Sequence, residues 1–440
     1  MGKKLIVVAC AATAFACTSA PPPRPAPVAA SDPVQEYREA LEETQASIAA
    51  REETPRVADA RALASIEIPS HPSIDGALRY FSTKLHGSIQ TSLERSSRYK
   101  TMIDEVLDEH RLPRALAWLP VIESAFLPGL TSSAGARGIW QFMPATAREY
   151  GLRVDWWIDE RADPELSTRA AARYLQDLHR IFDDWSLALA AYNCGPGRVE
   201  RTLDREGADT FWELLERSAL PKETRGYVPT FWATLLIAGD PEVHGFELPL
   251  PAPDRVDAIE VEGPARLDFV AALAGVDAKT LREMNPQLTR GLVPPGPARL
   301  RVPSGTGETV LAAARRAPFD DPDLPVTRFR VRPGDSIASL ARLADAPKPE
   351  ILAMNALRSD RLRAGTEIYL PLSTTDLSAA IESRRDVVYV VARGDTLYDI
   401  AHRHGIPLGE LLEINGLDRD TIIHPGDEIR VSRAAGVLAR

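Results

Sequence analysis

Between residues 71 and 248, apolar positions recur at the three- and four-residue spacing of helices, and no strand-like alternation persists. The stretch PELSTRAAARYLQDLHRIF (164–182) is an example, because Asp163 can cap a helix there and Pro164 suits its first position. The stretch LPRALAWLPVIES (112–124) is apolar nearly all round, which predicts a buried helix. We therefore expect an all-α domain over residues 71–248.

A second pattern follows and repeats. The segment 329–371 aligns with 389–431, and each copy opens with β-type alternation, continues with two short helical runs and closes with a short strand. Each copy also has an Asp, an Asn twenty residues later and then a Gly: Asp335, Asn355 and Gly365 in one, and Asp395, Asn415 and Gly426 in the other. The pattern predicts small βααβ modules, and we expect each aspartate to cap the helix that it precedes.

The segment 259–303 keeps the rhythm of these modules, with Asn285 and a Pro-Gly pair, but lacks their Gly-Asp-Ser/Thr opening. It is interpreted as a degenerate first copy. The expected organisation is therefore a multidomain chain with a helical domain followed by modules at 255–304, 326–372 and 387–432.

The N-terminus reads as an export signal over residues 1–17, with two lysines followed by an apolar run too short to span a bilayer. Ala-Phe-Ala before Cys17 allows ordinary signal cleavage. Alternatively, Cys17 is the lipidated first residue of a bacterial lipoprotein, although Ala14 stands where that pattern prefers Leu. The lipoprotein interpretation is favoured and predicts a periplasmic protein anchored to the outer membrane, with residues 18–70 as a Pro/Ala-rich tether and a charged segment.

Composition excludes several classes of function. The chain has 440 residues, of which 44% are hydrophobic and 26% charged, as in soluble globular proteins. Its formal net charge of -10 argues against nucleic acid as a partner, because neutralising phosphates takes a basic face. No Cys/His cluster has the spacing of metal ligands and no Gly-rich phosphate loop follows a strand, so neither a metal nor a nucleotide cofactor is expected.

Glu123 is the candidate catalytic group. A carboxyl near Ile122, Phe126 and Trp140 should be desolvated, which raises its pKa and keeps it protonated near neutral pH. A general acid needs that state in order to donate a proton to a glycosidic oxygen. Position alone leaves a second interpretation open, in which Glu123 is a paired structural residue.

Three further motifs favour the catalytic interpretation. SSAGARGIWQFMP has small residues that let the backbone approach a ligand, and it offers Gln141 to sugar hydroxyls. AAYNCGPGRV carries Tyr192 and Asn193 at the end of a helix, and ETRGYVP places Tyr227 where a phenol could bond a carboxyl. Each motif is weak by itself, since a Gly-rich turn is usually only a turn.

Together, the Glu-Ser pair, the Gly-Ala-x-Gly-x-x-Gln-Phe-Met-Pro run, Ala-Tyr-Asn-x-Gly-x-Gly and Glu-Thr-x-x-Tyr-Val resemble the lytic transglycosylase domain of the goose-lysozyme-like superfamily. The repeats resemble LysM modules, which bind glycans that contain N-acetylglucosamine. The resemblance covers about residues 75 to 431. It departs from many relatives at Trp140, where they carry Met.

The resemblance implies roles for particular residues. Glu123 is the acid and then the base, Ser132 holds the N-acetyl region of the sugar or a nearby water, and Tyr227 bonds to the catalytic carboxyl. Because Ser133 adjoins Ser132, the choice between the two serines depends on register. The residues that shape the glycan groove are Gln141, Phe142, Met143, Tyr192 and Asn193.

The resemblance also implies the reaction, which is cleavage of peptidoglycan between N-acetylmuramic acid and N-acetylglucosamine without water, leaving 1,6-anhydromuramoyl ends. A hydrolytic muramidase needs a second carboxylate, and an inactive glycan-binding scaffold is a third possibility. The acids nearest the Gln motif are expected to be solvated charges and helix caps: Asp155, Asp159, Glu160 and Asp163. Cys194 is expected to be a packing residue. Peptidoglycan is the expected partner, and the sequence does not identify any protein partners.

Overall fold

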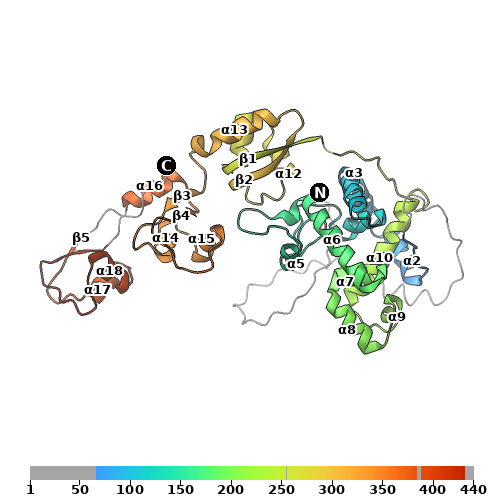
Figure 1. Cartoon of the computed structure of the whole chain (residues 1–440), viewed down its shortest axis with the longest axis horizontal. Helices are drawn as coiled ribbons and strands as arrows, with labels where there is room; N and C mark the ends of the chain where they lie inside the picture. Colours follow the sequence, from blue (N-terminus) through green and yellow to red (C-terminus); the bar gives the residue numbers. More distant parts are fainter. Residues whose placement is uncertain (1–65, 254, 384–387, 432–440) are drawn as a thin grey trace. The chain divides into compact units, whose positions relative to one another are not determined.

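The structure is a computed structural model that describes residues 66–253, 255–383 and 388–431 (Figure 1). The predicted signal at 1–17, the proposed lipidation at Cys17 and nearly all of the tether lie outside the described residues. Two compact units are present. The first comprises the described residues up to Val154 together with Asp159–Arg255, and the second comprises Asp155–Ile158 and the residues from Val256 onward. Within the described ranges, none of the helices combines the length and the apolarity that crossing a bilayer requires.

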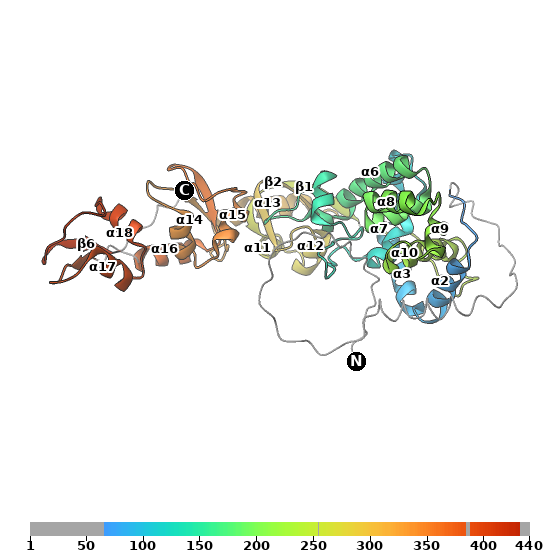
Figure 2. The same ribbon diagram turned by 90° about the horizontal axis from the view of Figure 1, so that it is seen from below.

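The first unit is built from helices, as predicted (Figures 1 and 2). Apart from isolated bridges in its loops, its described residues form no strand. The helices, with η marking 3-10 turns, are α2 (Pro72–Thr83), α3 (His86–Glu109), η1 (Arg114–Trp118), α4 (Leu119–Ser124), α5 (Pro144–Glu149), η2 (Glu160–Ala162), α6 (Pro164–Phe182), α7 (Trp185–Cys194), α8 (Pro196–Glu206), α9 (Phe211–Glu216) and α10 (Lys222–Gly239).

Local sequence sets the helix ends. The carboxylate of Asp163 accepts from the backbone N–H groups of Glu165 and Leu166, which confirms the predicted start of α6. Asp184 caps α7 in the same way through the N–H of Leu187. Helix α7 ends at Gly195, whose backbone φ of +89° is rarely adopted by residues other than glycine.

Helix α10 is the central buried helix of the first unit. It contacts α2, α4 and α7, and its side chains at Tyr227, Val228, Phe231 and Trp232 are at most 2% exposed. Helix α4 is short, but all six of its residues are buried. The contact between α10 and α4 brings together two segments that are about a hundred residues apart in sequence.

The second unit contains three two-stranded antiparallel sheets, each with two helices between its strands, so the predicted βααβ order is confirmed. A further helix follows each of the first two sheets, and the sequence analysis missed both. The elements are β1 (Val256–Arg266), α11 (Leu267–Ala274), α12 (Ala278–Met284), β2 (Leu292–Pro303), α13 (Gly307–Asp320), β3 (Thr327–Arg330), α14 (Ile337–Leu343), α15 (Lys348–Met354), β4 (Glu367–Leu370), α16 (Thr374–Ser383), β5 (Val388–Val390), α17 (Leu397–Arg403), α18 (Leu408–Asn415) and β6 (Glu428–Arg430).

The repeated asparagine joins the second helix of each module to its closing strand. Asn355 donates from Nδ2 to the Tyr369 carbonyl at 2.7 Å and accepts at Oδ1 from the Tyr369 N–H at 2.6 Å. Asn285 makes the same pair of bonds with Arg301, and Asn415 makes it with Arg430. One amide thus satisfies both backbone groups of a strand residue, as a neighbouring strand would. The same contacts in the first module explain why it keeps Asn285 without the rest of the motif.

The repeated aspartates do not cap the helices, so that prediction is wrong. Ser336 and Thr396 are the N-caps of α14 and α17. The Asp335 carboxylate accepts instead from the Arg332 N–H at 2.7 Å and closes the turn before the helix. Asp395 does the same with the Ala392 N–H at 2.8 Å.

Candidate active site

Glu123 lies in the last turn of α4, where it is 2% exposed. The hydroxyl of Tyr227 on α10 donates to its Oε1 at 2.5 Å. The helix ends at once at Ala125, whose φ of +51° turns the chain away. Ser124, the last residue of α4, donates to the Ile139 carbonyl at 2.9 Å and so fixes α4 to the loop that follows. The structure thus brings Glu123 and Tyr227 together, as the resemblance implied.

The environment keeps Glu123 protonated at neutral pH. Burial raises its pKa to about 8, because the charged form loses its hydration. The hydrogen bond from Tyr227 acts in the opposite direction and lowers the pKa, while the charge of Glu223 raises it. A buried carboxyl with a pKa near the working pH can give up a proton and later take one back.

Tyr192 lies close enough to this carboxyl to be affected by its charge, and Phe142 contacts Tyr192. The Tyr192 hydroxyl donates to the Trp140 carbonyl at 2.8 Å, and its ring meets that of Phe142 edge-on with centroids 6.5 Å apart. Burial and the charge of Glu123 raise the pKa of Tyr192 well above its usual value, so it stays a neutral phenol. Tyr192 near the end of α7 thus connects Glu123 to the loop after α4, through Trp140 and Phe142.

Ser132 opens the tight loop 131–142, which the structure shapes through its backbone. The Ser132 N–H donates to the Ala136 carbonyl at 2.8 Å, and the Ser132 hydroxyl oxygen accepts from the Ala136 N–H at 3.0 Å. Ser133 points to solvent. The two serines therefore differ in their surroundings, since only Ser132 has its side-chain oxygen held within the loop.

Gln141 and Asn193 each carry one buried side-chain atom without a hydrogen-bond partner. Gln141 donates from Nε2 to the Gly138 carbonyl at 2.9 Å, which leaves its Oε1 unpaired. Asn193 accepts at Oδ1 from the Thr224 hydroxyl at 2.7 Å, which leaves its Nδ2 unpaired. Both residues are 6% exposed. An unpaired buried acceptor and an unpaired buried donor are costly unless a ligand completes them.

Met143 is half-buried and immediately precedes α5, where its carbonyl accepts from the Ala147 N–H at 2.9 Å.

Cys194 is also half-buried, and burial raises the pKa of its thiol. A thiol in that state is a poor nucleophile, which agrees with a packing role.

The acids after the Gln motif have structural partners. Asp163 caps α6, as expected, and is 3% exposed. Asp155 accepts from the N–H groups of Trp157 and Ile158, and Glu160 accepts from the N–H of Arg153 at 2.7 Å. Asp159 pairs with Arg161 at 2.7 Å in a mostly buried ion pair.

The carboxylate whose charge acts on Glu123 is Glu223, which the sequence analysis missed. It lies one helical turn before Tyr227 on α10, a spacing that places two side chains on one face of a helix. That spacing was visible in the motif ETRGYVP, but its meaning depended on knowing that Tyr227 meets Glu123.

Comparisons with known proteins find three matching families and a relative over most of the chain. The family "Transglycosylase SLT domain" matches residues 102–215, the LysM domain matches 329–371 and 389–432, and the LysM-like domain of lytic transglycosylase MltD matches 255–317. Membrane-bound lytic murein transglycosylase D of Escherichia coli (strain K12) is 32% identical over 353 residues, which cover 76% of this chain and 76% of that protein.

Two further similarities cover smaller parts of the chain. Soluble lytic murein transglycosylase of Escherichia coli (strain K12) is 33% identical over 111 residues, covering 24% of this chain and 17% of that protein. The crystal structure of an inactive mutant of the lytic transglycosylase Slt from Pseudomonas aeruginosa aligns with a TM-score of 0.31 and 25% identity, covering 40% of this chain and 29% of that one.

Two glycines of the loop allow a matched test of its backbone. Gly135 and Gly138 both have a φ of +87°, but a Cβ on Gly138 would lie 1.7 Å from the Arg161 carbonyl oxygen, whereas one on Gly135 would meet nothing within 4 Å. Gly135→Ala should cost about 1 to 2 kcal/mol from backbone strain alone. Gly138→Ala should cost about 4 kcal/mol or more, the range in which local packing fails. Calorimetric unfolding of both variants checks this, and equal losses would contradict the close approach.

Proposed function

Because this chain belongs to the family of membrane-bound lytic murein transglycosylase D, we propose that it cleaves the bond between N-acetylmuramic acid and N-acetylglucosamine without water and leaves 1,6-anhydromuramoyl ends. It is a lytic transglycosylase that acts on peptidoglycan. The observation that carries the proposed mechanism is the protonated state of Glu123, which is buried and bonded to Tyr227.

Glu123 performs both proton transfers in this mechanism. Its carboxyl proton goes to the glycosidic oxygen as the bond from that oxygen to C1 of the muramoyl residue breaks. The resulting carboxylate then takes the proton of the 6-hydroxyl of the same sugar, and that oxygen bonds to C1. An attacking group within the substrate has a high effective concentration, so a second carboxylate to activate water is not required.

Tyr227 holds the acid in place and sets its strength. Its hydroxyl bonds to one oxygen of Glu123. It leaves the other oxygen for the substrate, and it stabilises the carboxylate that forms after the first proton transfer. Ser132, near the start of the loop, donates a hydrogen bond from its hydroxyl to the N-acetyl region of the sugar. Its oxygen already accepts from the Ala136 N–H, so its O–H is directed elsewhere.

The unpaired atoms of Gln141 and Asn193 suit an acetamido group. Such a group has one N–H donor and one carbonyl acceptor, which match the free Oε1 of Gln141 and the free Nδ2 of Asn193. Phe142, Met143 and Tyr192 supply apolar walls to the groove. This arrangement favours N-acetylated sugars over sugars with a hydroxyl at that position.

The modules at 326–372 and 387–432 tether the enzyme to glycan strands, and the segment at 255–304 is a degenerate module of the same fold. We place the protein in the periplasm, with Cys17 as the site of a lipid anchor to the outer membrane.

Hydrolysis is the second candidate, and Glu223 is the observation that favours it. Its charge acts on Glu123, so a carboxylate that could activate water lies near the acid. The masses of the products separate the two reactions.

The first test is the mass of the fragments released from purified peptidoglycan. We expect fragments one water lighter than hydrolysis products, and a loss of rate of about 100- to 10,000-fold in Glu123→Gln, because the amide has no acidic proton to transfer. Glycan binding by the variant should be unchanged in a pull-down with insoluble peptidoglycan. Fragments that carry the extra water would establish hydrolysis, and an active Glu123→Gln would remove Glu123 from the mechanism.

The dependence of kcat/KM on pH tests the environment of Glu123. The rate should be constant below a pH of about 8 and fall above it, because deprotonation removes the acid. Tyr227→Phe removes the hydrogen bond that lowers the pKa, so the falling limb should move to higher pH. Glu223→Gln removes a charge that raises the pKa, so the limb should move to lower pH. Shifts in the same direction for both variants would contradict this assignment.

Removal of residues 326–440 should lower activity on intact sacculi about 10-fold or more, because tethering raises the local concentration of substrate. Activity on short soluble fragments should change little, since they fill the catalytic groove alone. Initial rates on both substrates measure this, and an equal loss on both would argue against a tethering role.

A further inference from the structure

We propose that Arg161, paired with Asp159, is the positioning residue that holds the loop 131–142 in its productive shape. The inference rests on the proposed function, because it concerns the loop that carries Ser132 and Gln141. Arg161 lies outside every motif that carries the resemblance.

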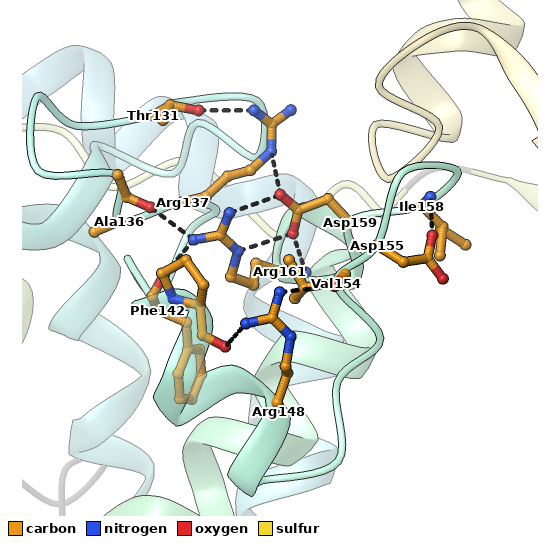
Figure 3. Close-up of polar contacts among 12 residues, drawn as sticks. Thr131, Ala136, Arg137, Phe142, Arg148, Val154, Asp155, Ile158, Asp159 and Arg161 are labelled. Atoms are coloured by element: carbon orange, nitrogen blue, oxygen red, sulfur yellow. Dashed lines mark hydrogen bonds and ion pairs between the residues drawn. The ribbon is translucent and has the colours of Figure 1, made fainter. Parts of the chain in front are cut away.

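The guanidinium of Arg161 donates hydrogen bonds to two backbone carbonyls of the loop. Its Nη1 donates to the Gly135 carbonyl at 2.7 Å and to the Phe142 carbonyl at 2.9 Å (Figure 3). Gly135 belongs to the turn that Ser132 closes, and Phe142 follows Gln141 directly. A single side chain, 6% exposed, therefore fixes the distance between the turn at Gly135 and the end of the loop at Phe142.

Asp159 orients that guanidinium. It accepts from Nε and Nη2 of Arg161 at 2.9 and 2.7 Å, a two-point contact that leaves Nη1 directed at the loop. A second guanidinium shares the same carboxylate, since Arg137 Nε lies 3.6 Å from Asp159 and Arg137 Nη1 donates to the Thr131 hydroxyl at 2.7 Å (Figure 3). Because both oxygens of Asp159 are engaged in this way, Asp159 is unsuited to activate water.

The backbone of Arg161 completes the support. Its carbonyl lies where a Cβ of Gly138 would be, so loop and support are in direct contact at that residue. Gly138 in turn donates to the Leu130 carbonyl at 3.1 Å and accepts from Gln141 through both the backbone N–H and Nε2. The turn Glu160–Ala162 therefore supports the loop through both the side chain and the backbone of Arg161.

This arrangement predicts an effect on turnover rather than on glycan affinity. Ser132 and Gln141 orient only the reacting sugar, whereas the modules and the rest of the groove bind the strand. A loop that shifts by about an ångström loses orientation at the reacting centre, which can cost about 100-fold in rate. An interaction that is realised in the transition state lowers kcat and leaves KM nearly unchanged.

The experiment compares Arg161→Lys, Asp159→Asn and the control Arg148→Lys in the full chain. Lys retains the charge but cannot bond to Asp159 at two points and to both carbonyls, and Asn keeps the shape of Asp159 without its charge. Arg148 also bonds to backbone carbonyls nearby, those of Val154 and Pro144, but to none within the loop (Figure 3). We expect kcat to fall about 10- to 100-fold in the first two variants with KM within about twofold, and no more than a twofold change in the control.

Rescue distinguishes positioning from stability. Arg161→Ala should regain at least part of its kcat when millimolar methylguanidinium is added, while the wild-type protein and Arg148→Ala should not respond. A variant that is merely unstable would lose further activity. If Arg161→Ala does not fold, the kcat and KM of Asp159→Asn decide the question, with its unfolding temperature as the check that the protein is intact.

The outcomes are separate from those of the proposed function. Wild-type products without the anhydro mass would overturn the reaction but leave the ratios between variants measurable. Variants at Arg161 and Asp159 with wild-type kcat, or with a raised KM alone and no rescue, would overturn the positioning role.

Discussion

The site depends on the burial of one carboxyl. Glu123 is 2% exposed in a helix whose six residues are all buried, and an ionised carboxylate there would lose its hydration. The protein meets this constraint by keeping the group protonated and by giving it one strong partner, Tyr227. That partner requires α10 to pass beside α4, which explains why a helix with apolar side chains on every face lies at the centre of the first unit.

In the proposed mechanism the Glu123 carboxyl acts twice, and its pKa suits both steps. Desolvation and the charge of Glu223 raise its pKa, and the Tyr227 hydroxyl lowers it, with a result of about 8. A much lower value would leave too little of the acid at neutral pH, and a much higher one would make proton donation to a glycosidic oxygen harder. After the first transfer, a carboxylate in this environment is a stronger base than one in water, as removal of a sugar hydroxyl proton requires.

The sequence was informative where the signal is local or repeated. The α6 start at Asp163, the helical class of the first unit and the βααβ order of the modules all follow from spacing within a few residues. The roles of Glu223 and Arg161 could not be predicted, because each depends on a partner brought close only by folding. Arg161 looked like one charge in an acidic loop, yet its carbonyl partner Gly135 is 26 residues away. The prediction that Asp335 and Asp395 cap their helices was wrong by one residue. The side chains of Ser336 and Thr396, which follow them directly, are the N-caps.

The amide side chains show how structural and functional polar groups differ in this chain. Asn285, Asn355 and Asn415 each donate to two backbone carbonyls and accept from one backbone N–H, so both ends of each amide are engaged within its module. Gln141 is held at its Nε2 by the Leu130 and Gly138 carbonyls and Asn193 at its Oδ1 by the Thr224 hydroxyl, and each is unpaired at the other end of its amide. An unpaired atom alone is not sufficient, because Trp232 has one in the helical core. What distinguishes Gln141 and Asn193 is that their sequence neighbours, Phe142 and Tyr192, contact each other, and that Tyr192 lies close enough to Glu123 to be affected by its charge. For that reason the proposed acetamido site uses these two amides and not Trp232.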